Sequence, residues 1–135
     1  MRITGEMGNL AAWEKRLFYM CSARPTLHPR ALFSDVTSDY RNPAEPVPGD
    51  EVTIRLRTGR YNVDKAYLVV DNVEHVMTRV RSESMFDYYE AKINVGTDKI
   101  YYYFKVELGR TVCYYNQIGA IKDLNPYYNF QITPG

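Results

Sequence analysis

MFDYYEAKINV (85–95), DKIYYYFKVEL (98–108) and TVCYY (111–115) are three segments in which polar and apolar side chains alternate along the chain. Such alternation is typical of β-strands, in which successive side chains point to opposite faces. Only Gly96-Thr97-Asp98 and Gly109-Arg110 separate the segments, and breaks this short fold each segment back on the one before it. The sequence therefore predicts three neighbouring antiparallel strands.

The period of two divides the side chains of these strands between an inner and an outer face. The inner face is apolar and predicts part of a core: it carries Tyr89, Ala91 and Ile93, then Ile100, Tyr102, Phe104 and Val106. The outer face is rich in aromatic rings: it carries Phe86, Tyr88, Tyr101, Tyr103 and Lys105. A core accounts for the first face, so the aromatic rings of the second face need another explanation.

The rest of the chain continues the strand pattern. Further strands are predicted at VTIRLRT (52–58), DKAYLVV (64–70), EHVMTRVRS (74–82) and YYNFQI (127–132). In the first of these, Val52, Ile54 and Leu56 alternate with polar side chains, as in a strand with one buried face. Seven strands separated by turns indicate an all-β fold, a β-sandwich. In residues 9–22, by contrast, apolar side chains recur every three to four positions and predict a short N-terminal helix.

Size, charge and cysteine content narrow the class of protein. The chain has 135 residues, the length of one domain, with 17 basic and 16 acidic side chains. This balance, without a basic stripe, argues against nucleic acid as a partner. Cys21 and Cys113 lack the spacing of a zinc site, and two cysteines so far apart give no disulfide framework, so we expect both thiols to be reduced. No segment has the apolar run of a secretory leader or a membrane span, so we expect a soluble cytoplasmic protein.

The sequence carries no recognisable catalytic or metal-binding motif. His28 and His75 stand outside any motif, and the patterns of zinc hydrolases, phosphate-binding loops and dinucleotide sites are missing. Asp87 and Glu90 point to opposite faces of one predicted strand, so they do not form a glycosidase pair. The scattered aspartates do not form a calcium loop. We therefore expect neither a catalytic site nor a metal or cofactor in this chain.

The outward tyrosines are the more promising functional candidates. A flat ring matches the apolar C–H face of a sugar, and neighbouring polar groups match its hydroxyls. Such a ligand surface would consist of Tyr88, Tyr101 and Tyr103, with Tyr67 and Lys105 nearby. Tyrosine is also common in strands for packing reasons, and an outer aromatic face more often covers another domain or subunit. The residues alone leave both explanations open.

Five segments occur in an order that is more specific than any one of them: HPRALFSDVTSDYRNPAEPVPGDEVTIRLRTGRYNV (28–63), FDYYEA (86–91), IYYYFKV (100–106), CYYNQIG (113–119) and YYNFQITPG (127–135). In this order the chain resembles the amino-terminal domain of the neopullulanase, cyclomaltodextrinase and maltogenic amylase group. That domain is classed as carbohydrate-binding module family thirty-four. It precedes an α-amylase-type catalytic barrel of glycoside hydrolase family thirteen.

The resemblance implies an immunoglobulin-like domain at residues 28–135, preceded by an extension at residues 1–27 that does not match the group. It implies an accessory domain of an intracellular α-glucan hydrolase that acts on α-1,4 or α-1,6 linkages, with the catalytic residues in a barrel outside this chain. The expected partners are α-glucans such as maltooligosaccharides or cyclodextrins, the barrel itself, and a second subunit in a homodimer. The alternative is a purely structural interface domain with no glucan affinity.

Overall fold

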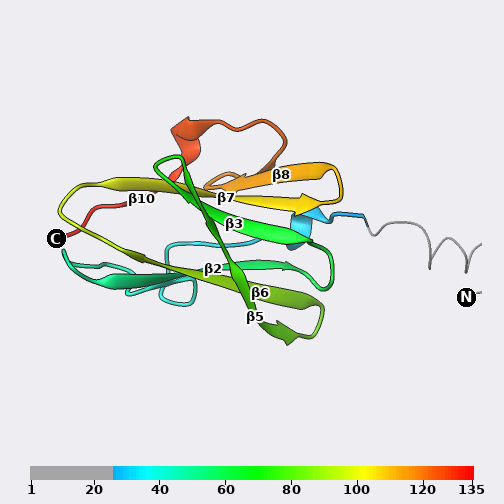
Figure 1. Ribbon diagram of the computed structural model, residues 1–135, viewed down its shortest axis with the longest axis horizontal. Helices are drawn as coiled ribbons and strands as arrows, with labels where there is room; N and C mark the ends of the chain where they lie inside the picture. Colours follow the sequence, from blue (N-terminus) through cyan, green and yellow to red (C-terminus); the bar gives the residue numbers. More distant parts are fainter. Residues whose placement is uncertain (1–25) are drawn as a thin grey trace, which may run out of the picture.

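The computed structural model describes residues 26–135, which form two antiparallel β-sheets packed face to face (Figure 1). Within this range the helical segments are two short 3-10 helices, η1 (Pro29–Ala31) and η2 (Pro126–Tyr128). The helix expected at residues 9–22 falls outside the described residues. The predicted all-β fold is confirmed, and two facing antiparallel sheets are the architecture of an immunoglobulin-like sandwich.

The two sheets differ in strand order. Sheet one has the order β1-β2-β6-β5 and consists of β1 (Arg41–Asn42), β2 (Glu51–Gly59), β5 (Thr78–Glu83) and β6 (Phe86–Asn94). Sheet two has the order β4-β3-β7-β8-β9 and consists of β3 (Lys65–Val70), β4 (Val73–Val76), β7 (Ile100–Leu108), β8 (Thr111–Asn116) and β9 (Gly119–Ile121). A last strand, β10 (Phe130–Ile132), pairs with the first residues of β7, and β8 pairs with the later ones.

The core lies between the two sheets and is built from the alternating residues that the sequence indicated. Val52, Ile54 and Leu56 of β2 have no exposed surface. From the opposite sheet, the ring of Tyr102 stacks on that of Phe130 with their centroids 5.1 Å apart. Removing such side chains from water is the dominant favourable contribution to folding, so these inward positions fix which face of each strand is buried.

The predicted pairing of segments 85–95 and 98–108 is wrong. β6 pairs with β2 and β5 in sheet one, whereas β7 pairs with β3, β8 and β10 in sheet two. Residues 95–99 carry the chain from one sheet to the other, and Val95 is buried on the way. This linker can span the roughly 10 Å between packed sheets, which a two-residue hairpin cannot. The prediction that segment 111–115 pairs with segment 98–108 is confirmed.

The predicted strand at 74–82 is two strands in different sheets. β4 pairs with β3, β5 pairs with β6, and the buried Met77 stands between them. In Figure 1 this stretch crosses in front of the sandwich from one layer to the other. Near the C-terminus, the predicted strand at 127–132 is shorter, because its first residues belong to η2, and the expected loop at 116–126 contains the short β9.

Candidate functional site

Four of the five predicted site residues lie together on the outer face of sheet two. Tyr101, Tyr103 and Lys105 alternate along β7 with the buried residues of the core, and Tyr67 of β3 stands directly opposite Lys105. The fifth, Tyr88, lies on β6 in sheet one and pairs with Arg57. Its predicted membership of one surface with Tyr101 and Tyr103 is therefore wrong, because β6 and β7 belong to opposite layers of the sandwich.

Lys105 is held in place by charge and by an aromatic ring. Its ammonium lies 4.7 Å from the centre of the Tyr67 ring and bonds to the Glu74 carboxylate, and Glu107 lies 3.6 Å away. The hydrogen bond to Glu74 raises the pKa of Lys105, so this side chain stays protonated well above neutral pH. Lys105 therefore acts as a fixed cation between two acids rather than as a free ligand donor.

Tyr103 points outward, as its position in the alternation predicted, but it is largely covered. Only 9% of it is exposed, and its ring meets that of Tyr114 edge to face with the centroids 5.9 Å apart. Burial raises the pKa of its phenol, which keeps the hydroxyl protonated and able to donate a hydrogen bond. Tyr101, two residues earlier, is 41% exposed and offers its ring to solvent.

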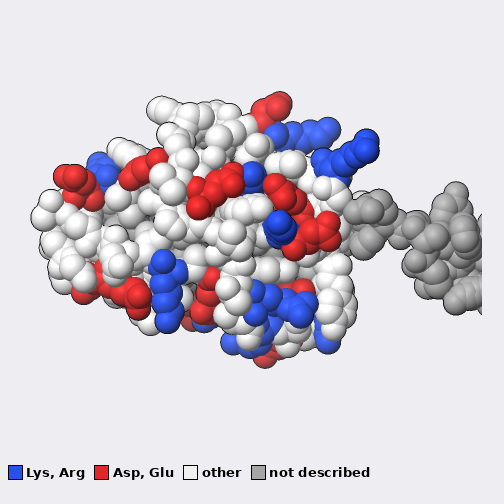
Figure 2. Space-filling view, viewed as in Figure 1, with Lys and Arg blue, Asp and Glu red and all other residues white. Residues whose placement is uncertain are grey.

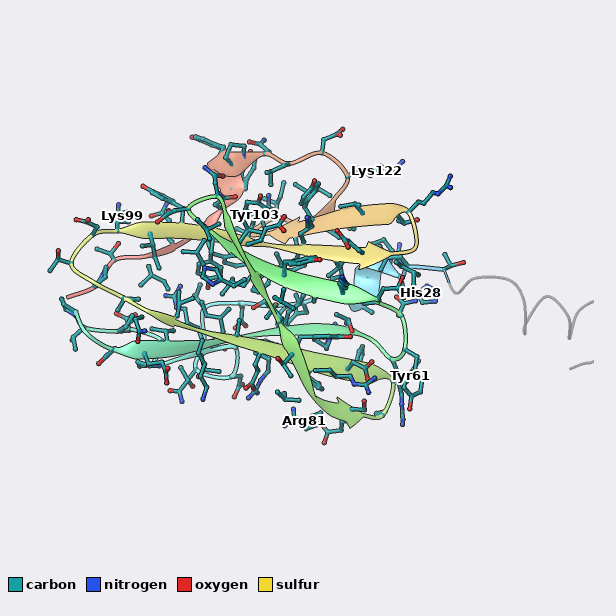
Figure 3. The ribbon with its side chains drawn as sticks, viewed as in Figure 1. His28, Tyr61, Arg81, Lys99, Tyr103 and Lys122 are labelled. Atoms are coloured by element: carbon teal, nitrogen blue, oxygen red, sulfur yellow. The ribbon has the colours of Figure 1, made fainter. Side chains whose placement is uncertain are left out.

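A hollow of about 300 Å³ lies beside these two rings. It is lined by Asp71, Asn72, Tyr101, Tyr103, Pro126 and Asn129. Figure 3 places Tyr103 on the layer formed by sheet two, and Arg81 on the opposite layer. The hollow combines two aromatic rings with a carboxylate and two amides, the mixture of flat apolar and hydrogen-bonding groups that polyhydroxylated ligands require.

One wall of the hollow is the tight turn between β3 and β4. Asp71 and Asn72 have φ values of 46° and 70°, the left-handed pair that two-residue hairpins use and that Asn and Asp adopt more readily than most residues. The Asp71 carboxylate accepts a hydrogen bond from the backbone N–H of Tyr101 at 3.1 Å, and the Asp71 N–H donates to the Tyr101 carbonyl at 2.9 Å. The turn is thus bound directly to the strand that carries the aromatic rings.

The other wall is η2 and the residue that follows it. The Asn125 side chain accepts a hydrogen bond from the N–H of Tyr127 at 3.1 Å and so caps the helix. Gln117 holds the same segment from β8's side, because its Nε2 donates to the Asn129 carbonyl at 2.8 Å and its N–H donates to the Tyr128 carbonyl at 2.9 Å. Sequence reasoning missed this wall, although Asn125 before Pro126 is a helix-start signal that could have located it.

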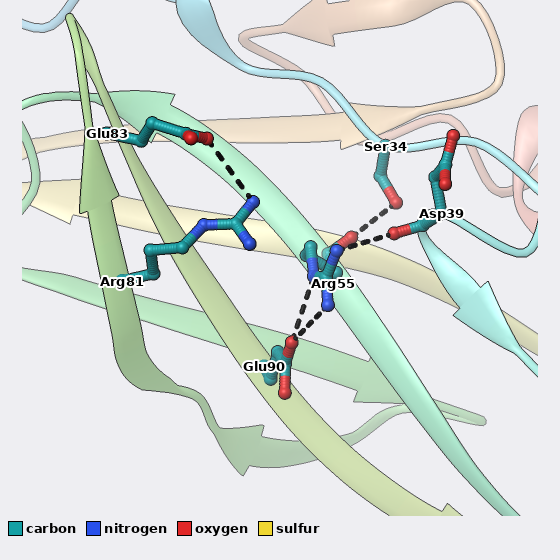
Figure 4. A network of polar contacts seen from close by, with 6 residues as sticks. All are labelled: Ser34, Asp39, Arg55, Arg81, Glu83 and Glu90. Carbon is teal, nitrogen blue, oxygen red and sulfur yellow. Dashed lines mark hydrogen bonds and ion pairs between the residues drawn. The ribbon is translucent and has the colours of Figure 1, made fainter.

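The outer face of sheet one has a different character. Arg81 lies over the Tyr88 ring at 4.4 Å and Arg57 lies over the Phe86 ring at 4.1 Å. Arg55 and Glu90 form an ion pair of 2.7 Å within the polar network of Figure 4. Figure 2 shows basic side chains gathered over the β5 and β6 end of this sheet. Stacked arginines and aromatic rings are enriched at protein interfaces.

Neither a metal site nor a membrane-spanning helix is found in the part of the chain that the structure describes. Residues 26–135 contain no group of three or more His, Cys, Asp or Glu side chains placed to hold a metal ion. None of their helices is long and apolar enough to cross a membrane. Cys113 is buried, and its thiol is free within this range.

Residues 40–133 match the model of the family described as alpha amylase, N-terminal ig-like domain. Among solved structures, a cyclomaltodextrinase matches with a TM-score of 0.64 and 18% identity over 77% of this chain and 19% of its own. A maltogenic amylase from S. marinus matches with a TM-score of 0.61 and 14% identity over 78% of this chain and 15% of its own. This chain thus spans only a small part of the length of either enzyme.

No curated protein sequence matches the chain. At these identities the solved structures establish the shared fold, and the family match covers the two sheets from β1 to β10. The chain belongs to the family of N-terminal Ig-like domains of alpha amylases.

Proposed function

We propose that this chain is the accessory N-terminal domain of a cytoplasmic α-glucan hydrolase and that it binds α-glucan at the hollow beside Tyr101. The domain itself would be residues 28–135, with residues 1–27 as an extension, and hydrolysis would take place in a catalytic barrel on the same full-length protein. The observation that carries the proposal is the half-exposed ring of Tyr101 at the mouth of a hollow with two firmly bonded walls.

The chemistry of the hollow suits a neutral sugar polymer. The Tyr101 ring can cover the apolar face of a glucose unit at a low cost in side-chain entropy, because a tyrosine has few rotatable bonds. Asp71 and Asn72 lie beside the ring and offer oxygen and amide groups to hydroxyls. Since the hydrogen bonds of Asp71 to β7 fix this wall before any ligand arrives, binding would not have to order it.

A second role is favoured by the outer face of sheet one. Its arginines stacked on Phe86 and Tyr88 form a flat basic and aromatic surface on the layer opposite the hollow. Arginine and aromatic residues contribute most to the binding energy of many protein interfaces. This face would pack against the catalytic barrel or a second subunit, and Tyr88 would then serve in packing rather than in glucan binding.

Titration of the chain with maltoheptaose and β-cyclodextrin, followed by calorimetry, tests the glucan proposal. The Tyr101→Ala variant is expected to bind about fivefold to a hundredfold more weakly, because an aromatic ring stacked on a nucleic-acid base contributes on the order of 1 to 3 kcal/mol, a similar contribution is expected on a sugar, and 1.4 kcal/mol is a factor of ten. Tyr61→Ala removes an even more exposed ring, on the turn after β2, and should bind like the wild type.

Two results would contradict the proposal: no heat of binding from the wild type at millimolar glucan, or a Tyr101→Ala variant with unchanged affinity. If the wild type binds no glucan but sediments as a stable dimer, the packing role of sheet one is favoured instead.

A further inference from the structure

The side chain of Asn129 contains a polar atom that residues 26–135 leave unpaired. Its Oδ1 is buried, and no group within residues 26–135 donates a hydrogen bond to it. The backbone of Asn129, by contrast, is fully engaged: its N–H donates to the Pro126 carbonyl at 3.2 Å and its carbonyl accepts from Gln117. The residue is thus held firmly in the wall of the hollow while its side-chain oxygen has no partner in the fold.

An unpaired buried polar atom works against folding. Leaving a buried acceptor without a donor costs on the order of 1 to 3 kcal/mol, and native structures contain few such groups. An apolar side chain of similar size, such as leucine, would avoid this cost at the same position. The side-chain oxygen of Asn129 therefore does not stabilise the isolated fold, and this points to a role in binding.

The surroundings of Asn129 restrict the kind of ligand. Among residues 26–135, one carboxylate, that of Asp71, lines the hollow, and neither a lysine nor an arginine does. A phosphate or carboxylate ligand would be repelled by Asp71 and would find no cation, whereas a neutral hydroxyl can donate to an oxygen or accept from an amide N–H. Asn129 itself lines the hollow, so its side-chain amide stands beside any ligand that fills it.

We propose that Asn129 is the specificity-determining contact of the hollow and that its side-chain amide hydrogen-bonds a hydroxyl of the glucose unit stacked on Tyr101. The proposal rests on glucan binding at this hollow. It assigns a separate task to each wall group: the ring supplies contact area, whereas the amide recognises the pattern of hydroxyls.

The Asn129→Leu variant tests this role, because binding and stability should respond differently. Its affinity for maltoheptaose is expected to fall about tenfold, a typical loss for one buried polar contact with a ligand. Its melting temperature should equal or exceed that of the wild type, since the unpaired oxygen is removed. Asn94→Leu is the matched control: this exposed residue at the end of β6 lies in the other sheet and should leave the affinity unchanged.

A lower melting temperature for Asn129→Leu would show a structural role and overturn the proposal, and so would an unchanged affinity. Should the leucine variant not fold, Asn129→Asp retains the size and an acceptor oxygen, and it must keep the affinity within about threefold of the wild type. If Tyr101→Ala loses binding while Asn129→Leu does not, this inference fails and glucan binding stands. If the wild type binds no glucan, both fail.

Discussion

Arg41 is a charged residue in a buried position. Its guanidinium donates to the Ala44 carbonyl at 2.9 Å, to the Gln131 carbonyl at 2.9 Å and to the Tyr102 hydroxyl at 3.3 Å. These bonds join the loop after β1 to the last strand of the domain. Arginine suits this position because its planar group can direct several N–H donors to fixed acceptors at once.

Arg41→Met is therefore expected to lower the free energy of unfolding by about 2 to 4 kcal/mol, because it removes charge-assisted hydrogen bonds and leaves buried carbonyls without donors. Urea unfolding followed by circular dichroism measures the loss. Arg30→Met changes an exposed arginine of η1 and should alter stability by no more than about 0.5 kcal/mol. A loss below about 1 kcal/mol for Arg41→Met would contradict the assigned role.

At this scale the sequence predicted the direction of individual side chains well. Tyr101, Tyr103 and Lys105 point outward on β7 as their alternation indicated, because a strand allows only two directions. The sequence could not predict the exposed fraction of each of these side chains. Tyr103 is nearly buried, and its ring meets that of Tyr114 on the neighbouring strand β8, a contact about which alternation within β7 contains no information.

At the scale of elements, the turn between β3 and β4 depends on backbone conformations that few residues accept. Asn72→Ala is expected to reduce the free energy of unfolding by about 1 kcal/mol, since a Cβ without a compensating polar group disfavours a φ of 70°. Asn72→Gly should be at least as stable as Asn72→Ala. Thermal unfolding of the two variants side by side measures the difference, and Asn94→Ala serves as a control outside the turn.

An alanine variant at position 72 with wild-type stability would show that the turn tolerates an ordinary backbone conformation.

The element boundaries also explain where the sequence prediction failed. β6 and β7 were predicted as neighbours because each alternates and a short linker joins them, but strands of facing sheets have the same period as strands of one sheet. In the structure, the buried Val95 marks the linker as a crossing between layers.

At the scale of the whole molecule, many tyrosine hydroxyls are withdrawn from water. Burial raises the pKa of a group of them: Tyr40, Tyr89, Tyr102, Tyr103 and Tyr115. Because the folded protein holds these protons more tightly than the unfolded chain, where tyrosine titrates near about pH 10, the folded state is favoured below that pH. Stability should fall as the pH rises above it, through the raised folded values.

Urea midpoints measured from neutral pH to strongly alkaline pH test this expectation. The midpoint should remain nearly level up to about pH 9 and then decrease, with tyrosinate absorbance appearing together with unfolding. An unchanged midpoint above the pH at which free tyrosine titrates would mean that the buried tyrosines ionise without unfolding the protein.

The overall fold class was predictable because composition, alternation and segment order agree, whereas the assignment of strands to layers required the three-dimensional structure.

The stretch from Val73 to Glu83 has a consequence for the fidelity of folding. Its first half is aligned against β3 and its second half against β6, and the N–H of Met77 between them donates to the Ala66 carbonyl at 2.9 Å. A shift of one residue in the half that pairs with β3 would turn Met77 out of the core, so the burial of this side chain favours a single register there. In the other half, the pairing with β6 is irregular between Arg79 and Arg81, and a bulge of this kind takes up one residue without moving the strand before it.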